Sequence, residues 1–194
     1  ELWDAPAPST ESSLNGPEYL VINPRYSACV PNHAGHIVIS LGGSDPHSLT
    51  KPCVDALADE ADVGTSPRRL VAIIGPAAAK GAETVSWHQG VSSTTKLVLS
   101  PKNLAPYLGG AALCVTATGM TAYEALAAGV PVILTNWSPD HVRTAQELAQ
   151  RGLAHNLGLW SEFDTVRLRR SVGHWLDDQG DWSRASILGR NLVD

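Results

Sequence analysis

The chain has 194 residues, of which 43% are hydrophobic and 17% are charged; this excludes a disordered or fibrous protein and is typical of one globular domain. Its 19 acidic and 14 basic residues give a formal charge of −5. This charge argues against a nucleic-acid partner, because phosphate backbones are bound by clustered Lys and Arg, and the dense basic run 167–170 is expected to be a solvated helix face.

Residues 1–16 are predicted to be a linker, and residues 17–194 a single domain. The linker is rich in Pro, Ser, Thr, Glu and Gly and holds too little apolar surface to order itself. It lacks the features of a signal peptide, and no stretch of the chain approaches the roughly 18 apolar residues of a transmembrane segment. The chain begins at Glu1 rather than Met, which indicates a fragment of a longer protein.

From residue 36 onward, short apolar runs alternate with segments of helical periodicity. Strands are predicted over 36–41, 69–75, 96–100, 112–117, 130–135 and, more weakly, 153–158. Helices are predicted near 47–60, 103–109, 121–128, 139–151, 162–178 and 181–190. Strands that are apolar throughout and alternate with helices indicate a parallel sheet covered on both faces. The predicted fold is therefore α/β, a Rossmann-like doubly wound parallel sheet of about six strands.

The cysteines and the first two histidines give no sign of a disulfide or metal site. Cys29, Cys53 and Cys114 are odd in number and lack the spacing of metal ligands, which favours a reducing, cytoplasmic location. His33 and His36 flank the start of a strand at a spacing that places them on opposite faces. We therefore expect no metal.

The first predicted strand ends in the glycine turn "SLGGSDP" at 40–46. Two glycines allow a tight backbone turn, and Ser44 or Asp45 can cap a following helix that has Pro46 in its first turn. Free N–H groups and the positive end of a helix dipole favour a phosphate at such a place. By itself this turn is equally compatible with an ordinary connection from strand to helix, because it matches no phosphate-binding motif.

A second glycine turn, "TATGMT" at 116–121, follows a later strand and should open at the same edge of the sheet. Two convergent anion sites suggest a diphosphate. Glu124 follows within one helical turn and has two interpretations. It can form a capping box with Thr121, without any chemistry, or it can accept hydrogen bonds from the vicinal hydroxyls of a ribose.

Several ordered motifs of the chain resemble the C-terminal half of GT-B proteins. They are "HIVISLGGSDP" (36–46), "SPKNLAPYLGGAALCVTATGMTAYEALAAGVPVIL" (100–134) and "ASILGRNLVD" (185–194), and "NGPEYLVINPRY" (15–26) resembles the segment leading into that half. The specific resemblance is to the family-28-type glycosyltransferase C-terminal domain. Within it, the chain is most similar to the UDP-sugar hydrolase of pseudaminic acid biosynthesis and its relatives in spore-coat polysaccharide biosynthesis.

This resemblance implies a site for a UDP-sugar, with no other cofactor. The two glycine turns would meet the diphosphate, Glu124 would hold the ribose, and the segment from Ser100 to Leu104 would contact the base. The residues expected to bind the donor are Gly42, Gly43, Ser44, Ser100, Asn103, Leu104, Gly119, Met120, Thr121, Glu124 and His141. No catalytic residue is predicted.

Two positions depart from the pattern of the family. Asp140 and His141 stand where relatives often have an Asn-Gln pair near the sugar. The resemblance therefore does not define which sugar is bound. His141 is a possible proton donor or sugar contact, but a loop histidine without a visible partner is more often plain surface. Thr118 stands where many relatives have a second glycine before Gly119, a change that would tighten the phosphate turn.

The resemblance further implies that the catalytic base and most acceptor contacts come from an N-terminal half, either in the same protein or in a partner chain. Two functions therefore remain open: the donor-binding half of a glycosyltransferase or nucleotide-sugar hydrolase, and a nucleotide-binding module without its own chemistry. A Rossmann-type oxidoreductase is disfavoured. It needs GxGxxG after the first strand and an acid after the second, and "RLVAIIGPAA" (69–78) lacks that acid.

Overall fold

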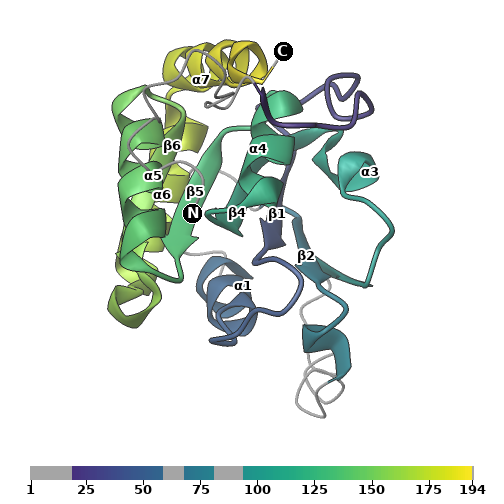
Figure 1. The fold of residues 1–194 in the computed structure, drawn as a ribbon, viewed down its shortest axis with the longest axis vertical. Helices are drawn as coiled ribbons and strands as arrows, with labels where there is room; N and C mark the ends of the chain where they lie inside the picture. Colours follow the sequence, from purple (N-terminus) through teal and green to yellow (C-terminus); the bar gives the residue numbers. More distant parts are fainter. Residues whose placement is uncertain (1–18, 59–67, 81–93, 194) are drawn as a thin grey trace, which may run out of the picture.

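Six parallel strands form one sheet in the computed structural model, which describes residues 19–58, 68–80 and 94–193 (Figure 1). The order across the sheet is β3-β2-β1-β4-β5-β6, and every neighbouring pair is parallel. The strands are β1 (His36–Ser40), β2 (Leu70–Ile74), β3 (Thr95–Leu99), β4 (Ala111–Ala117), β5 (Val132–Asn136) and β6 (Ala154–Leu159). The predicted fold class is confirmed. The predicted linker at 1–16 lies outside the described residues.

The helices follow the predicted order, with shifts at their ends. They are α1 (Thr50–Ala58), α3 (Ala105–Leu108), α4 (Met120–Ala127), α5 (Pro139–Gln150), α6 (Thr165–Asp177) and α7 (Gln179–Leu192), with short 3-10 helices at η2 (Ala78–Lys80) and η3 (Trp160–Glu162). The first helix begins at Thr50 rather than near 47. Asp45 and Ser48 adopt positive φ angles of 39° and 53°, which prolong the loop. Among the described residues, no helix has the length and apolar character needed to cross a membrane.

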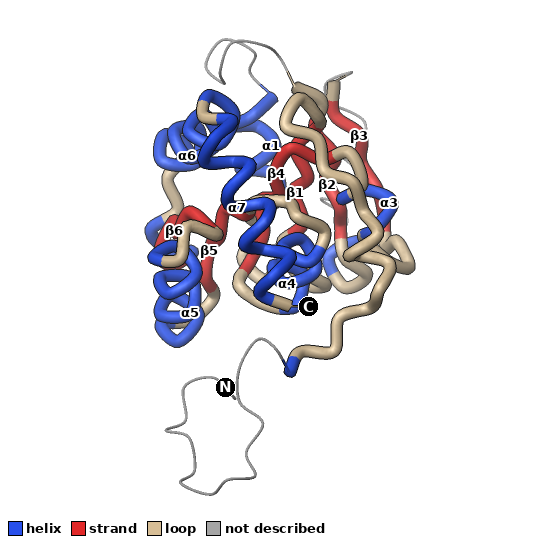
Figure 2. The backbone as a smooth tube through the Cα atoms, turned by 90° about the horizontal axis from the view of Figure 1, so that it is seen from above, coloured by secondary structure: helices blue, strands red, loops and turns tan. Residues whose placement is uncertain are grey.

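Helices cover both faces of the sheet because its strands are apolar on both sides (Figure 2). All residues of β2, β4 and β5 are buried. On one face, Ile37 and Ile39 of β1 pack in a cluster that includes α1 and α6. On the other face, Val38 packs in a cluster that includes α4 and α5. This alternation is the period of two of a strand, so each strand contributes to both cores.

The last helix, α7, ties the starts of the central strands together. Trp182 donates its Nε1–H to the carbonyl of Ala112, at the start of β4. The Arg190 guanidinium donates to the carbonyls of Ser27, Cys29 and Ala128 at 2.8, 2.6 and 3.0 Å. These contacts hold the segment before β1 and the loop before β5 at the amino edge of the sheet, and they leave the opposite edge uncovered by α7.

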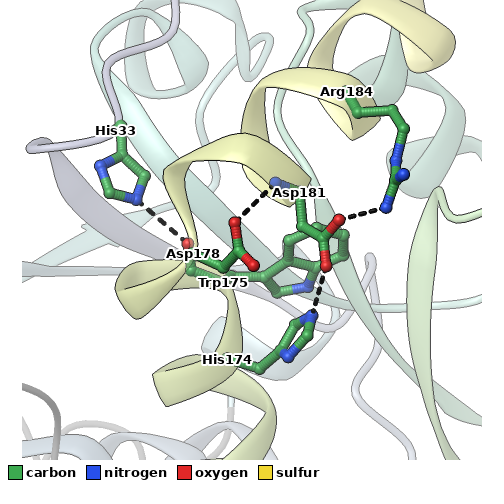
Figure 3. A network of polar contacts seen from close by, with 6 residues as sticks. All are labelled: His33, His174, Trp175, Asp178, Asp181 and Arg184. Atoms are coloured by element: carbon green, nitrogen blue, oxygen red, sulfur yellow. Dashed lines mark hydrogen bonds and ion pairs between the residues drawn. The ribbon is translucent and has the colours of Figure 1, made fainter.

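A polar network joins α6 to α7 (Figure 3). The Asp178 carboxylate caps α7 by accepting from the Asp181 N–H at 2.9 Å. His174 Nε2 lies 3.5 Å from Asp181 Oδ2, and His33 Nε2 lies 3.2 Å from the Trp175 carbonyl. His155 of β6 packs beside this network, with its ring centroid 4.6 Å from that of His174. The imidazole rings of His155 and His174 therefore lie against each other.

We expect the stability of the fold to decrease as the pH falls from about 6.5 to about 4 because of His155. Burial, together with the nearby His174 ring, lowers the pKa of His155 to about 4, against the opposing effect of Asp181. In this window the unfolded chain binds a proton that the folded chain excludes, so protons favour unfolding. For a half-buried imidazole the loss should be about 1–2 kcal/mol.

Urea unfolding of the wild type and of His155→Phe between pH 4.5 and 7.5 measures this effect. The Phe side chain keeps the ring packing and removes the titration, so the variant should show a shallower dependence on pH. An equal dependence in both proteins would assign the effect to other groups.

Candidate functional site

The carboxyl ends of all six strands meet at one edge of the sheet, because every pair is parallel. At the centre, Ser40 of β1 pairs with Thr116 of β4, so the loops after these strands are neighbours. The chain leaves β1 toward α1 on one face and leaves β4 toward α4 on the other. Loops that diverge at such a reversal of strand order open a crevice where α/β proteins bind ligands. The structure therefore brings the two predicted glycine turns together.

The first glycine turn has the backbone of an open loop rather than of a helix start. Gly42 has a φ of +85°, which favours glycine, and no heavy atom lies within 4 Å of the position of a Cβ on Gly42 or Gly43. The Asp45 carboxylate accepts from the N–H groups of Leu49 and Thr50 at 3.0 and 2.9 Å. Asp45 thus accepts from N–H groups at the start of α1, but it lies five residues before that helix and is not its N-cap residue. Pro46 likewise precedes α1 instead of lying in its first turn.

Gly75, which follows β2, lies directly against the backbone of the first glycine turn. A Cβ at this position would lie 2.4 Å from the carbonyl oxygens of both Gly42 and Gly43. The Ala77 N–H also donates to the Gly43 carbonyl at 3.0 Å. The two loops thus touch backbone to backbone, which only glycine permits. Gly75 was not among the predicted site residues, since its role depends on the adjacency of β1 and β2.

The second glycine turn leads directly into α4. Gly119 is the N-cap residue, no side chain caps the helix, and a Cβ on Gly119 would meet nothing within 4 Å. The capping-box interpretation of Thr121 and Glu124 is therefore wrong, because Thr121 lies inside the helix instead of at its cap. Met120 is 49% exposed beside this turn. The start of α4 presents backbone N–H groups with no side-chain partner, which suits an anion.

Glu124 instead contacts Tyr26, which was also not among the predicted site residues. Tyr26 is only 4% exposed, and its hydroxyl donates to the Glu124 carboxylate and accepts from the Leu104 N–H at 3.4 Å. Burial raises the pKa of Glu124, and the hydrogen bond from Tyr26 opposes this shift. Burial also raises the pKa of Tyr26 to about 12. The hydroxyl thus links α4 to the loop after β3.

The loop after β3 contains the residues predicted to contact a base. Ser100 has a φ of +46°, and its N–H donates to the Ile74 carbonyl at 2.9 Å. Asn103 is partly exposed, and Leu104 precedes α3 and packs against the apolar cluster around α4. Through Tyr26 this loop lies next to Glu124. The structure therefore groups it with the second glycine turn.

His141 lies in the first turn of α5, at the same edge. Its N–H donates to the Ser138 hydroxyl, the N-cap of α5, at 3.3 Å. Its Nδ1 atom is buried and has no hydrogen-bond partner. This orphaned atom is a feature that the sequence did not indicate.

His33 and His36, which were not expected to form a metal site, contact different helices. His33 bonds to the carbonyl of Trp175 in α6, whereas His36 Nε2 lies 2.7 Å from the carbonyl of Tyr107 in α3. The three cysteines are free and buried. Within the described residues, no group of three or more His, Cys, Asp or Glu side chains could hold a metal ion.

No family model matches the chain. Over 149 residues the chain is 26% identical to the spore coat polysaccharide biosynthesis protein SpsG of Bacillus subtilis (strain 168). This match covers 74% of the chain and 43% of SpsG, so the chain spans less than half the length of that relative.

Solved structures of glycosyltransferases share the fold over about half of their own length. WaaG, a glycosyltransferase involved in lipopolysaccharide biosynthesis, has a TM-score of 0.65 at 17% identity, covering 88% of this chain and 49% of WaaG. The spinosyn rhamnosyltransferase SpnG, complexed with thymidine diphosphate, has a TM-score of 0.65 at 18% identity, covering 95% and 50%. MurG of Acinetobacter baumannii has a TM-score of 0.65 at 16% identity, covering 99% and 55%. The resemblance inferred from the sequence is confirmed: the fold is that of a GT-B C-terminal half.

Proposed function

We propose that the chain is the donor-binding domain of a GT-B glycosyltransferase or nucleotide-sugar hydrolase and that its donor is a UDP-sugar. The observation that carries this proposal is the pair of open glycine turns at the adjacent ends of β1 and β4. Both offer free space where a Cβ would stand, and the second leads into an uncapped helix. A diphosphate can meet backbone N–H groups from both turns.

The ribose is assigned to Glu124. A carboxylate has about four acceptor positions, and the Tyr26 hydroxyl uses one of them. The remaining positions can accept the 2′ and 3′ hydroxyls of a ribose. The base is assigned to the loop 100–104, which directly follows the exposed Leu99. SpnG, which has this fold, was solved with thymidine diphosphate, and that ligand supports a pyrimidine nucleoside diphosphate here.

Catalysis is assigned to a second half, in the same protein or in a partner chain. Most titratable side chains described at the crevice already have structural partners: Glu124 is bonded to Tyr26, the Asp45 carboxylate accepts from the start of α1, and His47 stacks on Trp160. Asp140 and His141 lie in the first turn of α5. These groups serve binding better than the activation of an acceptor. We therefore propose that this chain binds the donor, without another cofactor, and does not turn it over.

Calorimetry of the 194-residue chain with UDP, UMP and NADH tests the proposal. UDP should bind about tenfold or more tightly than UMP, because the second phosphate adds charge-assisted hydrogen bonds. NADH should not bind, and no UDP should be released from a UDP-sugar. Absence of UDP binding would contradict the donor-site assignment, and release of UDP would contradict the requirement for a second half.

A further inference from the structure

A buried chain of hydrogen bonds runs from the second glycine turn to the edge strand β6. Thr118 Oγ1 donates to Asn136 Oδ1 at 2.6 Å. Asn136 Nδ2 then donates to Asn156 Oδ1 at 2.9 Å and to the Gly158 carbonyl at 2.8 Å. Thr118 is 6% exposed and Asn136 is fully buried. The carboxamide of Asn136 thus uses both of its N–H donors and its oxygen.

Such a network fixes one local geometry. Burying an amide is unfavourable unless all its groups are hydrogen-bonded, and a satisfied network holds its members in a single arrangement. The Thr118 N–H also donates to the Thr135 carbonyl at 3.1 Å, so residue 118 is held by backbone and side chain. It directly precedes Gly119. The position of the second turn is therefore set from β5 and β6.

The first glycine turn reaches the same end of β6 by aromatic stacking. The ring of His47 lies flat on that of Trp160, with centroids 3.6 Å apart and planes at 4°. The centroid of the His47 ring also lies 5.4 Å from that of the Trp137 ring. Trp160 directly follows β6, and Trp137 directly follows β5. The loop that begins at Gly42 is thus anchored two strands beyond its neighbour β4.

The backbone at the end of β6 is shaped for these contacts. The pairing of β5 with β6 shifts between Leu134 and Asn136, and Gly158 has a φ of +86°. Irregularities of this kind redirect side chains and are frequent near functional sites. Because β4 and β5 separate β6 from β1, strand pairing alone does not bring His47 to Trp160.

We propose that residues 156–160 form a positioning segment that sets the separation of the two glycine turns, so that both reach one diphosphate. Asn156 and Gly158 hold the second turn through Asn136 and Thr118, and Trp160 holds the first through His47. This inference rests on the proposed function. The segment acts through the turns, and none of its residues is assigned a contact with the ligand.

The test compares Thr118→Val with Thr118→Ser. Valine has nearly the shape of threonine but leaves Asn136 Oδ1 without its donor, whereas serine keeps the hydroxyl. Thr118→Val should weaken UDP binding about tenfold but UMP binding much less, because only a diphosphate spans both turns. Thr118→Ser should restore the affinity for UDP. Calorimetry gives the affinities, and circular dichroism confirms the fold.

A second pair of variants, at His47, provides the same test if Thr118→Val does not fold. His47→Ala removes the stack on Trp160, and His47→Phe keeps a ring there, so the first should lose affinity for UDP and the second should retain it. UDP affinities equal to the wild type in Thr118→Val and His47→Ala, or equal losses for UDP and UMP, would overturn the positioning role. A wild type that binds no UDP would instead overturn the proposed function, and this inference with it.

Discussion

Replacing Gly43 with valine should abolish UDP binding, lowering the affinity by about a hundredfold or more, and leave the fold intact. Gly43 is exposed, its φ is outside the left-handed region, and its Cβ would meet no atom within 4 Å. The fold therefore tolerates the side chain. The branched valine would fill the space assigned to the diphosphate and hold the phosphate oxygens away from the backbone N–H groups.

The matched control is Gly109→Val. Gly109 lies between α3 and β4, at the opposite edge of the sheet, with a φ of −59° and an ordinary contact of 3.5 Å for its Cβ. This variant should bind UDP as the wild type does. Calorimetry measures the affinities, and thermal unfolding compares the stabilities. Normal UDP binding by Gly43→Val would remove the first turn from the site.

The second large effect is expected at Glu124. The structure excludes its role as a helix cap, so the remaining alternatives are contact with a ribose and support of Tyr26 alone. Hydrogen bonds to a charged group contribute about 1.5–3 kcal/mol, against about 0.5–1.5 kcal/mol for neutral ones. Wild type should therefore bind UDP about tenfold or more tightly than 2′,3′-dideoxy-UDP. Glu124→Gln should bind both ligands weakly, with little difference between them.

This comparison is a double-mutant cycle in which protein and ligand lose the same interaction. Tyr26→Phe is the control, because it removes the hydroxyl next to Glu124 but leaves the carboxylate. It should keep most of the discrimination between UDP and the dideoxy ligand. Losses that simply add in Glu124→Gln, or a wild type that binds both ligands equally, would assign Glu124 to the support of Tyr26.

The fold could be predicted because the apolar sequence of each strand by itself indicates a buried strand. Runs such as 70–74 and 132–136 are buried on both sides, and buried parallel strands have near-continuous apolar sequences. Among the boundaries that shifted, the start of α1 was predicted about three residues too early. It depends on the positive φ angles of Asp45 and Ser48, which no hydrophobic pattern reports.

The two glycine turns could also be predicted, since a glycine directly after a strand indicates a tight turn from the neighbouring sequence alone. Tyr26 and Gly75 could not. Tyr26 meets the Leu104 N–H across 78 residues, and Gly75 matters only because the turn after β1 lies over it. The sequence suggested a tighter turn at Thr118, but its hydroxyl donates to Asn136 of β5, which in turn donates to Asn156 of β6. Such contacts depend on strand order, which residue spacing does not encode.

The contact of Gly75 with the first glycine turn has a consequence for how specificity can change. Because main chain rests on main chain at 42–43 and 75, this contact needs no particular side chain, although the placement of the turn also depends on the stack of His47 on Trp160. The segments after β3 and β5, by contrast, carry partly exposed side chains, such as those of Asn103 and His141. In the proposed donor site, the backbone contact that shapes the first glycine turn is therefore separate from the side chains of those segments. With that site, a different base or sugar can be accommodated by substitution in those segments, without any change to the backbone contact.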